Sequence, residues 1–279
     1  MALVAAERSD GTIALGGGST TGLGKAIALR TDLPQLVIPT TYAGSEMTNI
    51  LGETVDGGKT TIRDAKVVPE TVLYDVALTL GLPVAVSVTS AMNAVAHAVE
   101  GLYAVDGNPV ASLMAEESIR SFAVAVPAIV HDPSNIIARS DALYGAWLAG
   151  SVLGSTSMAL HHKLCHVLGG SFALPHAETH TVVLPHAVAY NAGHAPIAMA
   201  RIGHALGRTD VAAALFDLAA DAGAPTALRD LGMPEAALDR AADIAAESPY
   251  PNPRPIERDA VRALLDDAWH GRRPRGAGD

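Results

Sequence analysis

The chain has 279 residues, of which 49% are hydrophobic, 17% charged and 4% aromatic, and its formal net charge is −10. This length allows one large domain or two smaller ones with a substantial apolar core. The negative charge excludes general nucleic-acid binding, because there is no basic stripe to meet phosphates. The single cysteine, Cys165, excludes an internal disulfide framework.

Targeting and membrane signals are weak. No run of 18 or more uncharged apolar residues has membrane character, and the first residues lack the basic region and apolar core of a signal peptide. We therefore expect a soluble, cytoplasmic protein.

The first third of the chain has an α/β rhythm. A short apolar run at 12–15 ends in the glycines 16–18, and a helical pattern at 25–30 follows. A second apolar run at 35–41 breaks at its proline into a polar turn, and 66–75 favours a further strand region. Strand, glycine turn, helix and strand predict a parallel sheet that binds ligands at the carboxyl ends of its strands.

From Leu82 onward the pattern becomes helical. The expected helical stretches follow the run PVAVSVTSAMNAVAHAVEGLYA and cover 110–130, 136–166, 195–206, 211–223, 234–247 and 256–269. Breakers such as HDPSN, ALPHAE and SPYPNPRP separate them. We predict a remnant α/β domain at 1–81 and an all-helical domain at 82–279.

Two loops after strands are candidates for cofactor binding. In GGGSTTGLG, the residues Gly16, Gly17, Gly18 and Ser19 would let a pyrophosphate approach the backbone at a helix N-terminus. This run is not a GxGxxG pattern, and an ordinary strand-to-helix turn remains an alternative. In PTTYAGSEMT, the hydroxyls of Thr40, Thr41 and Ser45 could contact a cofactor or simply form a solvated turn.

Histidines are concentrated in one segment. Six of the eleven lie between 158 and 186, namely His161, His162, His166, His176, His180 and His186. His162 and His166 share one face of a helix, and Asn93 and His97 repeat that spacing. We expect Gly169 and Gly170 to fold the chain back toward a turn at His176. Imidazole serves both as a metal ligand and as a general acid, and the sequence supports either role.

Five segments together resemble one family. GGGSTTGLGKAIAL, PTTYAGSEMT, SVTSAMNAVAHAVE, MALHHKLCHVLGGSFALPHAETHTVVLPHAVAYN and NPRPIERDAVRALL are similar to the iron-containing alcohol dehydrogenase superfamily, and within it to the maleylacetate reductases. The resemblance runs from Gly11 to Trp269. It implies an α/β plus all-α protein of the dehydroquinate synthase-like fold. An incomplete Rossmann-like N-terminal domain would precede a helical C-terminal domain, with the active site in the cleft between them.

The resemblance also assigns metal positions. In metal-dependent members one Asp and three His hold the ion, and these positions correspond to Asn93, His97, His162 and His176. An amide is a poorer ligand than a carboxylate because it brings no charge. Maleylacetate reductases share the amide, so the resemblance implies a vestigial site without metal. His166 matches a further histidine near nicotinamide and substrate.

The cofactor implied by the resemblance is NADH or NADPH. Gly16, Gly17, Gly18 and Ser19 would contact the pyrophosphate, and Thr40, Thr41 and Ser45 the phosphate, ribose and nicotinamide. Lys59 matches a cofactor-contacting lysine.

The implied reaction is reduction of the C=C bond of maleylacetate to 3-oxoadipate during degradation of aromatic compounds. We expect His162, His166 and His176 to stabilise the enolate and supply the proton, and Asn93 and His97 to orient the substrate. Protonated histidines and Lys163 would balance the charge of this small dicarboxylate.

Two other functions remain open. One is a metal-dependent alcohol dehydrogenase of the same superfamily, and the other is an inactive fragment that serves for binding or oligomerisation. The chain begins closer to the glycines than family members do, so we expect unpaired apolar sheet edges and weak cofactor binding or poor folding. A homodimer is the family expectation.

Overall fold

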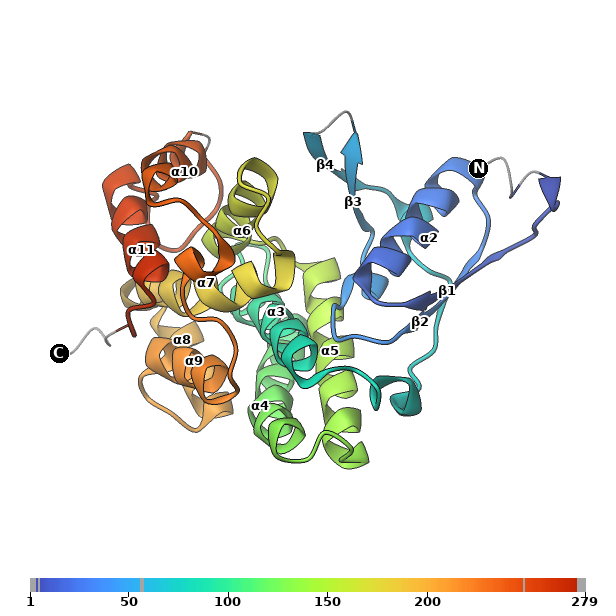
Figure 1. The fold of residues 1–279 in the computed structure, drawn as a ribbon, viewed down its shortest axis with the longest axis horizontal. Coiled ribbons are helices and arrows are strands. Elements are labelled where there is room, and N and C mark those ends of the chain that lie inside the picture. Colours follow the sequence, from blue (N-terminus) through green and yellow to red (C-terminus); the bar gives the residue numbers. More distant parts are fainter. Residues whose placement is uncertain (1–3, 5, 56–57, 248, 275–279) are drawn as a thin grey trace.

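The computed structural model describes residue 4 and residues 6–55, 58–247 and 249–274, with the side chains of 54, 55 and 58–60 outside that description. All the described strands lie before residue 73, and the chain is helical from Val84 onward (Figure 1). The strands and α2 form one end of the molecule, and the long helices form the other.

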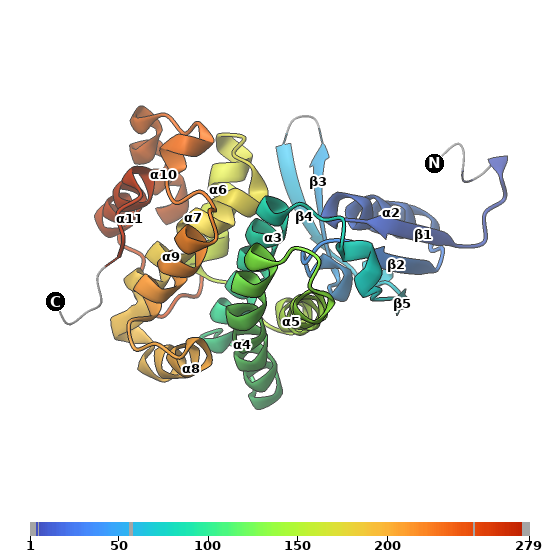
Figure 2. The ribbon, with the colours of Figure 1, turned by 60° about the horizontal axis from the view of Figure 1, so that its bottom comes forward.

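A small parallel sheet lies at the N-terminal end. Its order is β1 (Thr12–Gly16), β2 (Gln35–Pro39) and β5 (Thr71–Val72), and α2 (Gly18–Thr31) connects the first two strands and packs on them. Figure 2 shows α2 lying along β1 and β2. The predicted strand, glycine turn, helix and strand are confirmed.

The expected strand region at 66–75 is mostly wrong. Only Thr71–Val72 is a strand, and short 3-10 helices flank it at Ala65–Val67 and Val76–Thr79. The Asp64 and Asp75 side chains each accept a hydrogen bond from an N–H two residues ahead, which favours these turns over an extended backbone.

Among the described residues, no further strand pairs with the β1 edge of the sheet, and apolar side chains of β1 are exposed. β1 is an edge strand, and its Ile13 and Leu15 side chains are 72% and 54% exposed. Exposed apolar residues on an unpaired edge are the feature that the sequence predicts.

An antiparallel hairpin lies between β2 and β5 along the chain and was not predicted. β3 (Ile50–Val55) pairs with β4 (Gly58–Arg63), and in both views the hairpin stands between α2 and the helical part (Figures 1 and 2). Lys59 lies in β4 opposite Thr54. Its side chain is outside the described residues.

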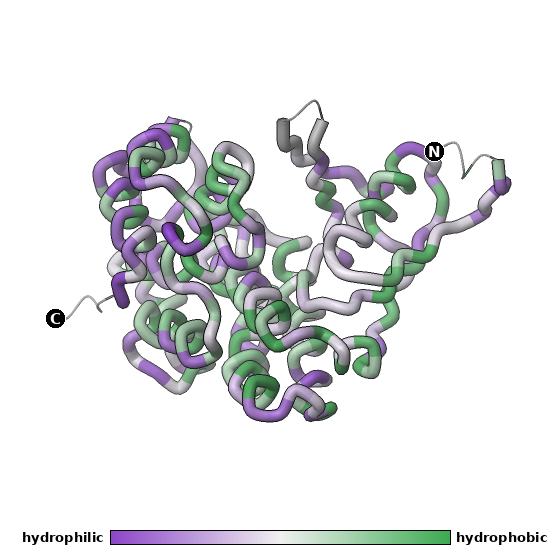
Figure 3. The backbone as a smooth tube through the Cα atoms, viewed as in Figure 1, coloured by the Kyte–Doolittle hydropathy of each residue, from purple (hydrophilic) through white to green (hydrophobic). Residues whose placement is uncertain are grey.

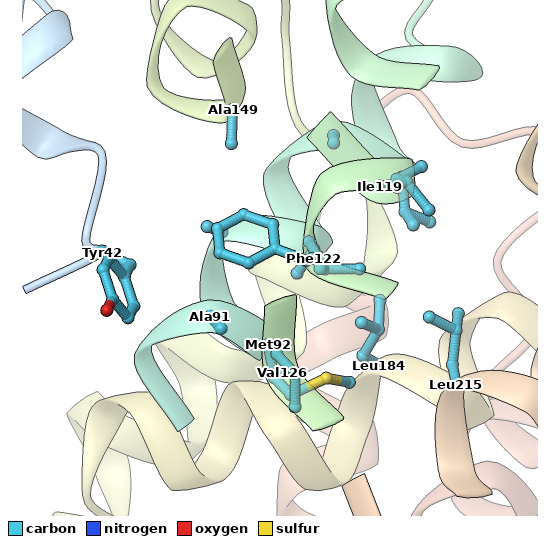
Figure 4. Close-up of a cluster of buried hydrophobic side chains, with 14 of the residues drawn as sticks. Tyr42, Ala91, Met92, Ile119, Phe122, Val126, Ala149, Leu184 and Leu215 are labelled. Atoms are coloured by element: carbon cyan, nitrogen blue, oxygen red, sulfur yellow. The ribbon is translucent and has the colours of Figure 1, made fainter. Parts of the chain in front are cut away.

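The helical part surrounds α3 (Val84–Leu102), in which every residue from 87 to 101 is buried. The other helices are α4 (Pro109–His131), α5 (Ile136–Ser155), α6 (Leu160–Ser171), α7 (His176–Asn191), α8 (Pro196–Leu206), α9 (Val211–Asp221), α10 (Leu238–Ala246) and α11 (Arg258–His270). The largest core cluster joins α3, α4, α5, α7 and α9. Figure 4 shows Tyr42, from the loop after β2, at the edge of this cluster, and its ring meets that of Phe122 edge to face with centroids 6.3 Å apart.

Two expectations about the helices are wrong. The stretch 136–166 is divided between α5 and α6, because α6 has its own N-terminus, capped from outside by Glu100 and Asn252. Gly169 and Gly170 lie inside α6, so they do not fold the chain back, and the turn falls after Ser171. His176 is the first residue of α7 rather than part of a turn.

The C-terminal helices α10 and α11 are amphipathic, and hydrophilic and hydrophobic residues alternate along them (Figure 3). Their apolar faces form a second core cluster with α6 and α7. Among the described residues, no helix is both long and apolar enough to cross a membrane.

Candidate active site

The glycine loop between β1 and α2 forms one wall of a cavity of about 400 Å³. Gly16 has φ +154°, and a Cβ there would lie 2.4 Å from Thr20 Oγ1. No side chain caps the N-terminus of α2, and its first turn carries no acidic residue. A helix N-terminus of this kind attracts an anion such as a pyrophosphate. Gly18 and Ser19 line the cavity, whereas Gly16 and Gly17, which were also expected at the pyrophosphate, are not among its lining residues.

The second candidate loop packs tightly on α5. Gly44 has φ +79°, and a Cβ on Gly150 would lie 2.5 Å from the Gly44 carbonyl oxygen. Ser45 lines the cavity, but Thr40 and Thr41 are not among its lining residues. Thr40 joins the two loops instead, because its N–H donates to the Gly16 carbonyl at 3.0 Å.

A buried lysine, which the sequence did not predict as a site residue, holds this second loop. Lys25 is 1% exposed, and its Nζ donates to the carbonyls of Ser45, Thr48 and Ile50 at 2.6, 2.6 and 2.9 Å. Burial lowers the pKa of Lys25 to about 8, and the nearby Glu46 opposes this shift. Lys25 thus connects α2, next to the glycine loop, with the loop that carries Ser45.

One face of α3 supplies the opposite wall. Asn93 and His97 are both 4% exposed and line the cavity. Asn93 Oδ1 and His97 Nδ1 have no hydrogen-bond partner in the part of the chain that the structure describes. Burial lowers the pKa of His97, and the neighbouring His162 and His176 lower it further. His97 is therefore neutral at neutral pH.

Glu100 organises the start of α6 and was also missed. It is fully buried, and it accepts hydrogen bonds from the N–H groups of Ala159 and His161 at 2.8 and 2.9 Å. Its Oε2 lies 2.7 Å from His162 Nδ1. The contact places the proton of the His162 ring on Nδ1, which faces the carboxylate, and leaves Nε2 facing the cavity. Its spacing could have identified it from the sequence, because Glu100 follows His97 by three residues and so lies on the same helix face.

Five imidazoles gather in the cavity, from α3, α6 and α7. The rings of His97 and His162 stack with centroids 5.1 Å apart, and those of His162 and His166 are 6.3 Å apart. The ring centroids of His176 and His180 are 4.3 Å apart, and His180 lies one turn further along α7. The cavity thus contains five of the predicted histidine and asparagine site residues together with His180, which was not predicted as a site residue.

A buried pair of side chains supports this cluster from behind. His161 Nε2 lies 2.9 Å from His180 Nδ1 and 3.7 Å from Cys165 Sγ. Burial lowers the pKa values of both histidines and raises that of the thiol. All three side chains are neutral at neutral pH, and the contact with His161 orients the His180 ring.

The mouth of the cavity carries a cation. Arg63, at the end of β4, lines it together with Thr61 and Ile50. Lys163, which we expected to balance substrate charge, lies instead 5.7 Å over the Tyr250 ring and is not among the lining residues.

The buried side chains of the cavity have the chemistry of ligands for a divalent metal ion. Asn93 Oδ1, His97 Nδ1 and His162 Nε2 are buried and lack partners among the described residues. The contact between His162 and Glu100 is the arrangement by which carboxylates orient metal-binding imidazoles. The set lacks an anionic ligand, because Asn93 occupies the carboxylate position.

Comparison with known proteins identifies relatives along the whole chain. Residues 1–76 match the family model "Iron-containing alcohol dehydrogenase", and residues 87–269 match "Fe-containing alcohol dehydrogenase family, C-terminal". A maleylacetate reductase from Burkholderia cepacia is 60% identical over 95% of this chain and 76% of its own length.

Solved structures agree with this relationship. The crystal structure of maleylacetate reductase from Agrobacterium tumefaciens has 56% identity and a TM-score of 0.95, over 98% of this chain and 78% of that one. The enzyme of the same name from Rhizobium sp. strain MTP-10005 has 54% identity and a TM-score of 0.94, over 97% and 77%. The fold predicted from the resemblance is confirmed. The chain belongs to the iron-containing alcohol dehydrogenase family.

Proposed function

We propose that this protein is an oxidoreductase that reduces the C=C bond of maleylacetate to give 3-oxoadipate, with NADH or NADPH as the hydride donor. One observation carries the proposal: a single cavity joins the glycine loop at the N-terminus of α2 to five histidines and Asn93. The maleylacetate reductases at 53–60% identity support this substrate.

The dinucleotide fits the α2 side of the cavity. Gly18 and Ser19 would bind the pyrophosphate through backbone N–H groups that no side chain occupies. Ser45, whose buried hydroxyl lacks a partner among the described residues, would contact the nicotinamide end. The bound nicotinamide would supply hydride, and the chain would fix its position and exclude water.

The histidine side of the cavity would stabilise the developing charge. In maleylacetate the C=C bond is conjugated with a ketone, so addition of hydride to the carbon β to the ketone puts negative charge on the ketone oxygen. Imidazole N–H donors of His162, His166 and His176 would stabilise this enolate, and one of them would protonate the neighbouring carbon. Asn93 and His97 would orient the substrate. Hydrogen bonds of this kind are stronger in a buried site than in water.

A metal ion is the main alternative for stabilising the enolate oxygen. The comparisons do not support our expectation of a metal-free site, because the matched family is described as iron-containing. Asn93, His97, His162 and His176 would hold the ion, which would act as a Lewis acid at the ketone oxygen. The amide at Asn93 favours weak binding, and we propose that turnover does not depend on metal.

We propose a cytoplasmic homodimer that acts in the degradation of aromatic compounds on a small dicarboxylate substrate.

The test is oxidation of NADH and NADPH with maleylacetate, measured on this chain and on a version extended at its N-terminus to the length of its relatives. We expect turnover that survives chelator, with less than one metal ion per chain by elemental analysis. About one ion per chain and loss of activity with chelator would contradict the metal-independent reaction and favour the metal-dependent alternative. No turnover by either version would exclude the proposed reaction, and turnover by the extended version alone would make this chain an inactive fragment.

A further inference from the structure

We infer that Arg63 binds a terminal carboxylate of the substrate and makes the site selective for dicarboxylates. The inference rests on the proposed function, because it assigns the recognition group for that substrate. Arg63 lies on the β3–β4 hairpin, outside the histidine segment that suggested the chemistry.

The strand register directs Arg63 toward the cavity. Ile50 pairs directly with Arg63 across the hairpin, and Thr61 lies two residues before it on β4. Directly opposed residues share one face of a hairpin, as do residues two apart along a strand. All three line the histidine cavity, so this face of the hairpin is turned toward the site.

Arg63 is the one Lys or Arg side chain among the described lining residues of this cavity. No carboxylate of a described residue forms an ion pair with it within 4.0 Å, and its hydrogen bond to Asn49 Oδ1 is long, at 3.5 Å. The pKa of Asp106 is lowered mainly by the hydrogen bond from the Ser157 N–H, and Arg63 adds a smaller Coulombic effect. The guanidinium is therefore available for an incoming anion.

A terminal carboxylate at the mouth of the cavity needs a local positive charge, and Arg63 supplies one there. A protein of net charge −10 also repels a dianion at long range. A guanidinium remains charged at any working pH and matches a carboxylate with two parallel hydrogen bonds.

The arrangement suits a substrate with a central ketone and a carboxylate at each end. The Arg63 side chain is exposed at the mouth, whereas His97 and His162 are buried further in. A ketone oxygen among the imidazoles would leave a terminal carboxylate to reach the mouth.

The experiment compares Arg63→Met and Arg63→Lys with Arg120→Met, which removes the same charge from an exposed site on α4. We expect Arg63→Met to raise KM for maleylacetate about 10–100-fold, the range expected for losing a charged hydrogen-bonded pair. KM for the dinucleotide should change less than twofold. Arg63→Lys should recover part of the loss, and Arg120→Met should match the parent.

A binding measurement keeps the inference separate from the proposed reaction. Adipate, a stable dicarboxylate of the same chain length, is titrated by calorimetry into the parent and the three variants, with hexanoate as the monocarboxylate control. We expect Arg63→Met to lose at least tenfold in adipate affinity and to bind hexanoate as the parent does. Equal adipate affinity in parent and variant, no adipate binding by the parent, or a rise confined to KM for the dinucleotide would overturn the inference.

Discussion

Oε2 of Glu100 lies 2.7 Å from Nδ1 of His162, and the same carboxylate accepts the backbone N–H groups at the start of α6. One fully buried side chain on α3 thus sets both the position of α6 and the orientation of a ring in the cavity. The consequence is that the usable nitrogen of His162 is Nε2, which faces the site.

Replacing Glu100 should therefore affect turnover more than binding. Glu100→Gln keeps the size of the side chain, but its amide cannot accept every N–H that the carboxylate accepts. We expect kcat to fall ~10–100-fold, with KM for the dinucleotide unchanged, because the loss lies in the orientation of His162. Steady-state kinetics and a thermal melt check this, with Glu117→Gln on the surface of α4 as the control. If Glu100→Gln kept the parental kcat, Glu100 would not be required to orient His162 for turnover.

Lys25 should control dinucleotide affinity. Lys25→Met leaves the carbonyls of Ser45, Thr48 and Ile50 without their buried donor. We expect the unfolding free energy to drop by ~2–4 kcal/mol. KM for the dinucleotide should rise at least several-fold, because the loop that carries Ser45 loses its attachment to α2. Lys66→Met, at an exposed lysine, is the control, and equal KM values in the two variants would contradict the role.

The close contact between Gly150 and Gly44 predicts that Gly150→Ala moves the loop of Ser45 away from α5. A Cβ on Gly150 would lie 2.5 Å from the Gly44 carbonyl oxygen, whereas one on Gly170 meets nothing within 4 Å. We expect Gly150→Ala to destabilise the fold and raise KM for the dinucleotide. Gly170→Ala should be neutral or stabilise α6 by ~0.5–1 kcal/mol. Urea unfolding of both variants tests this, and equal stabilities would be inconsistent with the contact.

Acid should destabilise the protein through its buried histidines. Burial lowers the pKa of His186 from 6.5 to about 4, with Asp267 opposing the shift. As the pH falls below 6.5 the unfolded state takes up a proton before the native state does, so the unfolding free energy decreases between pH 6.5 and 4. The expected slope is ~1.4 kcal/mol per pH unit from this group, and His161 and His180 act in the same direction.

The contribution of His186 can be isolated. Urea unfolding at several pH values should give a shallower slope for His186→Phe than for the parent, since the ring lies against Phe216 and tolerates an aromatic replacement. His204→Gln, at an exposed histidine, should keep the parental slope. An unchanged slope in His186→Phe would show that His186 is not buried in its neutral form.

The sequence predicted the parts of the fold that depend on local pattern. The β1–α2–β2 unit follows from apolar runs around the glycines, and Asn93 and His97 share a helix face because of their spacing. Where a contact from another element decides the structure, local pattern fails. The separation of α5 from α6 depends on Glu100, and Pro175 and His176 begin a helix where the sequence indicated a turn.

The same distinction between local pattern and distant contacts applies to the candidate site. Residue spacing places His162 and His166 on one helix face and Asn93 with His97 on another, and the family resemblance predicted that these faces meet. The glycines precede a helix N-terminus as expected. Lys25 and Arg63 could not be predicted from neighbouring residues. Lys25 donates to carbonyls 20 or more positions away, and Arg63 is placed by pairing across a hairpin. Thr40 and Thr41 were expected at the cofactor but are not in the cavity lining, since the loop turns there to place Ser45 instead.

The central claim is reduction of a C=C bond rather than a C=O bond, and isotope transfer tests it most directly. The protein is incubated with maleylacetate and dinucleotide carrying deuterium at the transferable position of its reduced nicotinamide ring, and the product is read by mass spectrometry and NMR. We predict 3-oxoadipate with one deuterium at the carbon β to the ketone. Deuterium on a new carbinol carbon, with the C=C bond intact, would contradict the account.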